Sequence, residues 1–102
     1  MNINARDKHG QTGLMQAARH GRLDIVEFLI RNGAALDYTA KFGLSALMLA
    51  VVNGHADVAR VLTQAGARQD LRGTGAPGFD GKTALDLAKA RGDGDLVAAL
   101  GM

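Results

Sequence analysis

The stretch from Gly10 to Ala34, GQTGLMQAARHGRLDIVEFLIRNGA, decides the fold, because it returns 33 residues later as Gly43 to Ala67. The two copies align without a gap, so that four characteristic positions recur: Leu14 as Leu47, Gly21 as Gly54, Asp24 as Asp57 and Leu29 as Leu62. A third, shorter copy runs from Gly81 to Leu100, after an insertion of five residues. A period of 33 residues is typical of arrays in which each unit is a loop followed by two short helices. The chain is therefore predicted to be a stack of three units that share one core.

Each unit carries start and stop signals for its two helices. A hydroxyl side chain that can accept a hydrogen bond from free helix N–H groups precedes each first helix: Thr12, Ser45 and Thr83. The first of these helices is predicted to run from about Gly13 to His20, and Gly21 ends it because glycine takes the left-handed conformation without steric cost. An aspartate in the first turn of each second helix suits the helix dipole: Asp24, Asp57 and Asp95. The apolar stripe of the first of these second helices consists of Ile25, Val26, Leu29 and Ile30.

These residues make the chain resemble the ankyrin-repeat family, whose unit reads roughly D-x-x-G-x-T-P-L-H-x-A-A-x-x-G-H-x-x-I-V-x-x-L-L-x-x-G-A-x-x-N, with matches from Ile3 to Leu100. The chain departs from this motif where the family has proline (Gly13, Ala46, Ala84) and histidine (Met15, Met48, Asp86). The resemblance implies an all-α solenoid of helix-turn-helix units with β-hairpin-like fingers. It also implies one domain over residues 1–102, with units at about 4–36, 37–69 and 70–102, the last acting as a polar cap.

Composition argues against several classes of protein. The chain has 12 basic and 10 acidic residues, a net charge of +2, so no charge block favours nucleic acid or a membrane surface. Cysteine is absent, which excludes disulfides and thiolate metal sites. No apolar run is long enough to span a membrane, and MNINARDKHG lacks the apolar region of a signal peptide. We expect a soluble, intracellular and cytoplasmic protein, and the sequence leaves open whether a further unit precedes the first finger.

The five inserted residues fall within residues 71–80, and we call this whole segment the insertion. It contains Gly73, Gly75, Pro77 and Gly78 and has no apolar periodicity, so it is predicted to be a mobile loop without regular structure. Its end, Ala76 to Thr83 (APGFDGKT), fits a relaxed phosphate-binding loop with alanine in place of the first glycine. However, Gly81-Lys82-Thr83 is in register with Gly10-Gln11-Thr12, and no buried strand precedes it. The repeat therefore explains this stretch better than a nucleotide site does.

No group of residues in the sequence suggests catalysis or metal binding. His9, His20 and His55 are the only histidines, and none has the spacing to a carboxylate that a metal site needs. We expect all three to be exposed surface residues. We therefore predict that the chain is not an enzyme and that it binds no cofactor and no metal.

The resemblance implies instead that a partner protein binds the finger tips and the exposed side of the first helices, which line a concave face. Mapped onto this chain, those positions are Lys8, His9, Gln11, Arg19, His20, Tyr38, Lys41, Phe42, Leu44, Val52, Asn53, Phe79, Asp80, Lys82 and Arg91. We expect exposed Phe42, Leu44 and Val52 at the centre of the surface and a rim of cations around them. In the alternative, Phe42 and Phe79 fold back to cover the fingers.

The sequence thus predicts a monomeric, non-catalytic protein–protein interaction module whose partner it does not identify. One alternative is a structural scaffold, or a repeat segment that self-associates weakly through an incompletely capped N-terminal face. Nucleotide binding through Ala76 to Thr83 is a more remote alternative.

Overall fold

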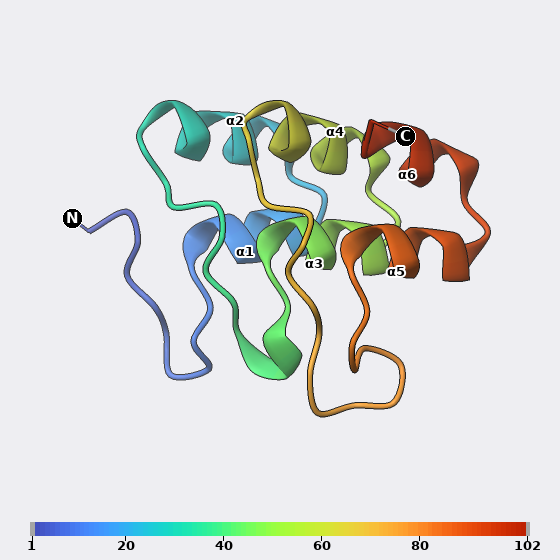
Figure 1. Ribbon diagram of the computed structural model, residues 1–102. Helices are drawn as coiled ribbons and strands as arrows, with labels where there is room; N and C mark the ends of the chain where they lie inside the picture. Colours follow the sequence, from blue (N-terminus) through green and yellow to red (C-terminus); the bar gives the residue numbers. More distant parts are fainter. Residues whose placement is uncertain (1, 102) are drawn as a thin grey trace.

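The computed structural model describes residues 2–101, which form two layers of helices (Figure 1). One layer contains α1 (Gly13–Arg19), α3 (Ala46–Val52) and α5 (Ala84–Arg91), and the other contains α2 (Leu23–Arg31), α4 (Ala56–Gln64) and α6 (Gly94–Ala99). Each helix contacts its neighbours in the same layer in chain order. The prediction of an all-α solenoid of helix pairs is therefore confirmed. Among the described residues, no helix is long and apolar enough to cross a membrane.

The predicted caps begin the helices of the first layer. The hydroxyl oxygens of Thr12 and Ser45 accept hydrogen bonds from the backbone N–H groups of Met15 and Met48, at 3.2 and 3.3 Å. Thr83 and Asp86 form a reciprocal capping box at α5, as their spacing predicts. The backbone N–H and the hydroxyl of Thr83 hold the pKa of the Asp86 carboxyl below its ordinary value. The start of each first helix is thus fixed by local sequence.

The core lies between the layers and is continuous through the stack. Leu47 on α3 and Val58 on α4 are fully buried, as the register predicts. Ile25, which occupies the position of Val58 in the first repeat, is 43% exposed. The apolar stripe of α2 is therefore only partly buried, because no second helix among residues 2–101 covers the side that carries Ile25.

Adjacent repeats are tied by side chains that hydrogen-bond to backbone. The amide oxygen of Asn4 accepts from the N–H of Ala35 at 2.7 Å, and the carboxylate of Asp37 accepts from the N–H of Arg68 at 2.8 Å. Both acceptors stand at the same place in their repeats, so the same link recurs along the stack. The spacing of Asn4 and Asp37, 33 residues, is the sequence signal for this link.

A second link between repeats corrects the expectation that His55 is a solvated surface residue. Its Nε2 lies 3.0 Å from the carbonyl oxygen of Arg19, at the end of α1. Likewise, Nη1 of Arg91 donates to the carbonyl of Val52, at the end of α3, at 3.0 Å. In each case a later repeat caps the exposed C-terminal carbonyls of the preceding first helix. The Arg91 guanidinium, which was expected on the rim of the binding surface, is thus engaged between repeats.

The insertion has no helix or strand, but it is packed against the finger of the second repeat, which carries Phe42. The prediction of a mobile loop is therefore not supported. The N–H of Thr74 donates to the carbonyl of Phe42 at 2.7 Å, and Gly73 donates to Lys82 at 2.9 Å. Gly73 is buried, and a Cβ there would collide with the carbonyl oxygen of Phe79. The glycines and the proline therefore account for the turns of this loop, and its contacts with other parts of the chain hold the loop in place.

Candidate functional site

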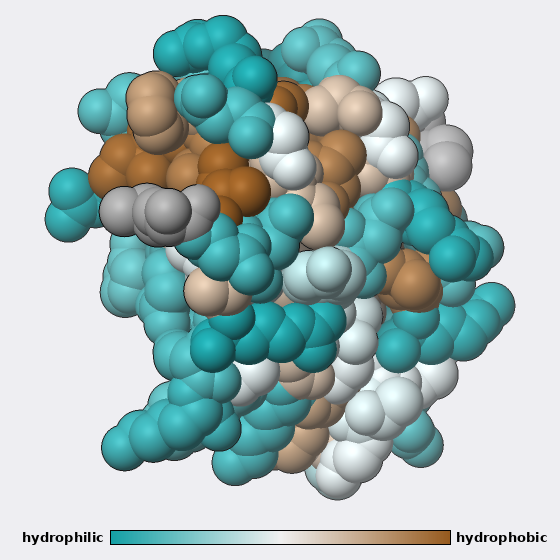
Figure 2. Space-filling model, turned by 90° about the vertical axis from the view of Figure 1, so that its left-hand side faces the viewer, coloured by the Kyte–Doolittle hydropathy of each residue, from teal (hydrophilic) through white to brown (hydrophobic). Residues whose placement is uncertain are grey.

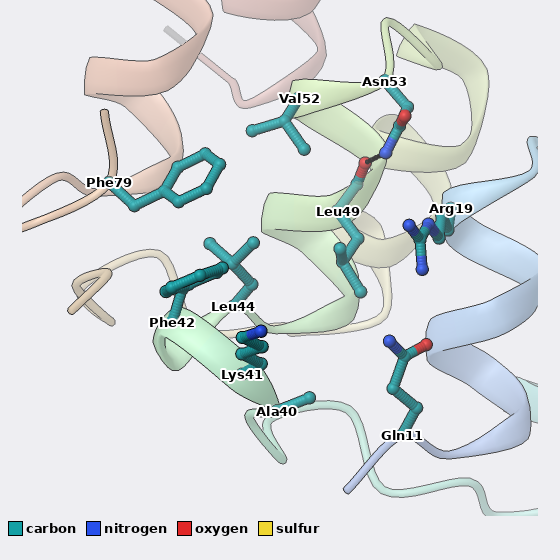
Figure 3. Close-up of a pocket in the computed structure, with 10 residues that line it drawn as sticks. All are labelled: Gln11, Arg19, Ala40, Lys41, Phe42, Leu44, Leu49, Val52, Asn53 and Phe79. Atoms are coloured by element: carbon teal, nitrogen blue, oxygen red, sulfur yellow. Dashed lines mark hydrogen bonds between the residues drawn. The ribbon is translucent and has the colours of Figure 1, made fainter. Parts of the chain in front are cut away.

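A groove lies between the fingers and the first-helix layer, beside α1 and α3 (Figure 3). Its volume is about 410 Å³, within the range of protein sites that enclose a small ligand or a large side chain. Residues from all three repeats line it: Gln11, Arg19, Ala40, Lys41, Phe42, Leu44, Leu49, Val52, Asn53 and Phe79. The groove is therefore a product of stacking, since no single repeat contains it.

The side of the groove formed by the second and third repeats is apolar. Phe42, on the short 3-10 helix η1 (Lys41–Gly43), and Phe79, in the insertion, have ring centroids 5.8 Å apart and planes tilted by 40°. This geometry is in the range of favourable aromatic pairs. Both rings are half-buried and pack on the core, with Val52 and Leu44 close by (Figure 3). The two rings thus cover part of the fingers, as in the alternative, and still line the groove.

Phe42 is held in an unfavourable backbone conformation. Its φ is 64°, and it is the one residue other than glycine with a positive φ in residues 2–101. The left-handed conformation costs a residue with a side chain roughly 1 to 2 kcal/mol. The hydrogen bond from the N–H of Thr74 to the Phe42 carbonyl helps to hold this turn. Strain of this kind persists where the surrounding structure enforces it, and it is concentrated at functional sites.

The opposite side of the groove is polar and cationic. Gln11 and Arg19, from the first repeat, face the apolar side across the groove (Figure 3). Lys41 Nζ lies 5.1 Å from the centroid of the Phe42 ring, at the finger end. The ten lining residues include these two cations, Arg19 and Lys41, and no carboxylate. The groove therefore favours a ligand that combines an apolar group with negative charge.

Local hydrogen bonds hold two polar positions of the groove, Gln11 and Asn53. The Asp7 carboxylate accepts from the backbone N–H groups of Gln11 and His9, each at 2.9 Å, and these bonds lower the pKa of Asp7. Asp7 thereby fixes the finger that carries Gln11. On the other side, the Asn53 amide donates to the carbonyl of Leu49 at 2.8 Å. In the polar lining, the backbone at Gln11 and the side chain of Asn53 are thus held by local hydrogen bonds.

The structure brings together about half of the positions predicted for the partner surface. Those in the groove are Gln11, Arg19, Lys41, Phe42, Leu44, Val52, Asn53 and Phe79. Of the others, Lys8, His9 and Lys82 are exposed on the fingers. Tyr38 is 40% exposed, with the Arg6 guanidinium carbon 4.3 Å from its ring centroid. His20 lies at the N-terminal end of the stack, and Asp80 borders a shallow hollow in the insertion.

Leu44 requires a correction, because its side chain is 6% exposed and so is not a surface residue. Its carbonyl accepts from the N–H of Ala40 at 3.0 Å, which closes the finger and turns the side chain toward the core. Two further lining residues, Ala40 and Leu49, were not predicted from the sequence. Leu49 stands where the first repeat has Gln16, and its apolar character gives no sign that it borders a groove.

Neither a metal site nor a nucleotide site finds a matching arrangement among residues 2–101. Within residues 2–101, no three His, Cys, Asp or Glu side chains gather in a way that could hold a metal ion. At the start of α5, the Asp86 carboxylate accepts from the N–H of Thr83 at 3.1 Å. A phosphate at this helix end would therefore meet a carboxylate that already occupies the N–H group.

Comparisons with known proteins agree with the repeat architecture. A family model described as "Ankyrin repeats (3 copies)" matches residues 1–73, which is more than half of the chain. A segment of 40 residues is 45% identical to "Serine/threonine-protein kinase TNNI3K" of Mus musculus and to the protein of the same name of Rattus norvegicus. The match covers 39% of this chain but 5% of each relative, so the similarity is confined to a small part of those kinases. The chain, with its 33-residue units, its layered helix pairs and this family match, belongs to the ankyrin-repeat family.

Proposed function

We propose that this chain is a non-catalytic module that binds a partner protein through the groove beside α1 and α3. Ankyrin repeats are in general protein–protein interaction modules. The observation that carries the choice of surface is Phe42, an aromatic residue kept in a left-handed turn at the groove. Glycine would form the same turn without that cost. A role in binding accounts for the presence of phenylalanine at this position.

The chemistry of the lining indicates what the partner presents. An apolar side chain of the partner would enter between the rings of Phe42 and Phe79 and the side chain of Val52. A carboxylate beside it would reach Arg19 or Lys41, and arginine forms especially strong hydrogen bonds to carboxylates. We therefore expect a partner segment with an aliphatic or aromatic anchor and a nearby Asp or Glu. An intracellular, cytoplasmic site of action remains a prediction.

We expect Phe42→Ala and Arg19→Glu each to weaken the complex at least tenfold. Removing a ring that a partner buries costs about 1.5 to 3 kcal/mol, and tenfold in affinity corresponds to about 1.4 kcal/mol. Immobilised wild-type chain would retain the partner from a lysate of the source cell, and calorimetry with the purified partner would give each Kd. Arg19→Glu is easier to interpret than Phe42→Ala. The Phe42 ring packs on Phe79 of the insertion, whereas the Arg19 side chain is exposed.

Arg60→Glu is the matched control for Arg19→Glu, since Arg60 on α4 is exposed and lies outside the groove. It should leave partner affinity unchanged. An affinity that ignores Phe42 and Arg19 but falls when Asp24 or Glu27 on α2 is changed would place the binding surface on the second-helix layer and contradict the proposal.

A further inference from the structure

The N-terminal end of the stack presents an apolar face that the groove does not use. Ile25 and Phe28 on α2 are 43% and 56% exposed. Figure 2 shows this end of the molecule, with an apolar area at the height of α2 and polar residues around it. At the position of Ile25, the later repeats have Val58 and Leu96, which are fully buried. Inside the stack, this position is thus covered by the preceding second helix, whereas no helix among residues 2–101 covers it on α2.

The opposite end of the stack is closed by charged residues. The positions that face the next repeat are apolar and buried in the first two units, as at Met15 and Met48, both 1% exposed. The third unit has Asp86 at this position, and Lys89 follows one turn later, both exposed. An apolar end and a charged end are poorly matched to each other. A second copy that covers α2 would therefore use its own α2 in preference to its C-terminal end.

Two exposed charges near opposite ends of α2 are placed to pair with the same face of a second copy. Asp24 and Arg31 lie near opposite ends of the helix, seven residues apart, which is about two turns, so both lie on the same side of the apolar stripe. In residues 2–101 neither takes part in an ion pair. When two α2 helices pack antiparallel about a two-fold axis, Asp24 of each copy meets Arg31 of the other, and Glu27 and Phe28 lie between the two pairs. Such an interface uses the same surface patch on both subunits.

We propose that the α2 face of this chain binds the α2 face of a second copy and forms a two-fold symmetric dimer. Ile25 and Phe28 form its apolar centre, and two Asp24–Arg31 pairs form its edge. The groove beside α1 and α3 lies outside this face, because the two surfaces share no residue among those that define them. Dimer formation therefore does not depend on the proposed partner binding.

The test is sedimentation velocity of the purified full chain at concentrations up to about 1 mM, the range that detects a weak complex. Wild type should show a concentration-dependent dimer, and Phe28→Asp should be monomeric throughout. Asp24→Arg and Arg31→Asp should each weaken the dimer about tenfold at low salt, because each places like charges opposite one another. Thermal melting of each variant shows whether it is folded, and substitutions at these exposed positions should leave folding intact.

Mixing the two charge variants is the decisive arm. In a mixture of Asp24→Arg and Arg31→Asp chains, every facing pair is again opposite in charge, so a heterodimer should form at wild-type concentration. Lys89→Glu, at the charged end, should have no effect on the dimer. A wild-type monomer at every concentration, association that Lys89→Glu disrupts, or a mixture that fails to restore the dimer would each overturn the proposal.

Discussion

Leu47→Ala is expected to lower the free energy of unfolding by about 2 to 5 kcal/mol, the usual cost of emptying a fully buried leucine site. Leu47 is 0% exposed on α3, which packs between α1 and α5. Because α3 cannot move toward one of these helices without losing contact with the other, the cavity left by the substitution cannot close. Urea unfolding followed by circular dichroism measures the change. A variant that melts within a degree or two of wild type would show that the middle repeat is not packed on both sides.

Leu85→Ala is the matched control, because Leu85 occupies the position of Leu47 in the last repeat and is half-exposed there. The same truncation should cost clearly less at Leu85, since part of the side chain is already in water. Equal losses at both positions would indicate that stacking contributes little to the burial of Leu47.

Gly21→Ala is expected to cost about 2 to 4 kcal/mol, more than the same change at Gly33. Both glycines have positive φ, 69° and 87°, so each variant carries about 1 to 2 kcal/mol of backbone strain. A Cβ at Gly21 would also lie 2.6 Å from Nδ1 of His55, whereas nothing lies within 4 Å at Gly33. The His55 ring would have to move and lose its hydrogen bond to Arg19, which adds about 1 kcal/mol or more.

A double-mutant cycle isolates the contribution of the ring. In a His55→Ala background, Gly21→Ala should cost no more than Gly33→Ala, because the group that a Cβ would displace is gone. Chemical unfolding of the four chains gives the coupling free energy. A cost at Gly21 that stays the same with and without His55 would mean that the ring does not tie the second repeat to the first.

The periodicity of the sequence predicts the elements that depend on local sequence. The hydroxyl caps at Thr12, Ser45 and Thr83, the capping box with Asp86 and the burial of Leu47 follow from residue type and spacing alone. The packed insertion does not, because its position rests on Phe79 meeting Phe42 and on hydrogen bonds between two different fingers. Amino-acid composition can predict that this segment forms turns, but it cannot predict which part of the chain those turns pack against.

The groove could be predicted in outline but not in its lining. The repeat places Arg19, Lys41 and Phe42 on one face of the stack, whereas the burial of Leu44 and the contribution of Leu49 depend on how adjacent repeats are packed together. The strained backbone of Phe42 is also invisible in the sequence, since residue type favours the left-handed conformation at the following Gly43, which adopts it as well with a φ of 70°. Contacts between repeats, rather than local propensity, decide these details.

Site-specific photo-crosslinking in the source cell tests most directly whether the groove is the binding surface. A benzophenone amino acid would replace either Lys41, exposed at the groove, or Arg60, exposed on α4 in the second-helix layer. We predict that irradiation yields a covalent adduct with one partner protein from the Lys41 position and none from the Arg60 position. Adducts that form from the Arg60 position alone would contradict the account and place partner binding on the second-helix layer.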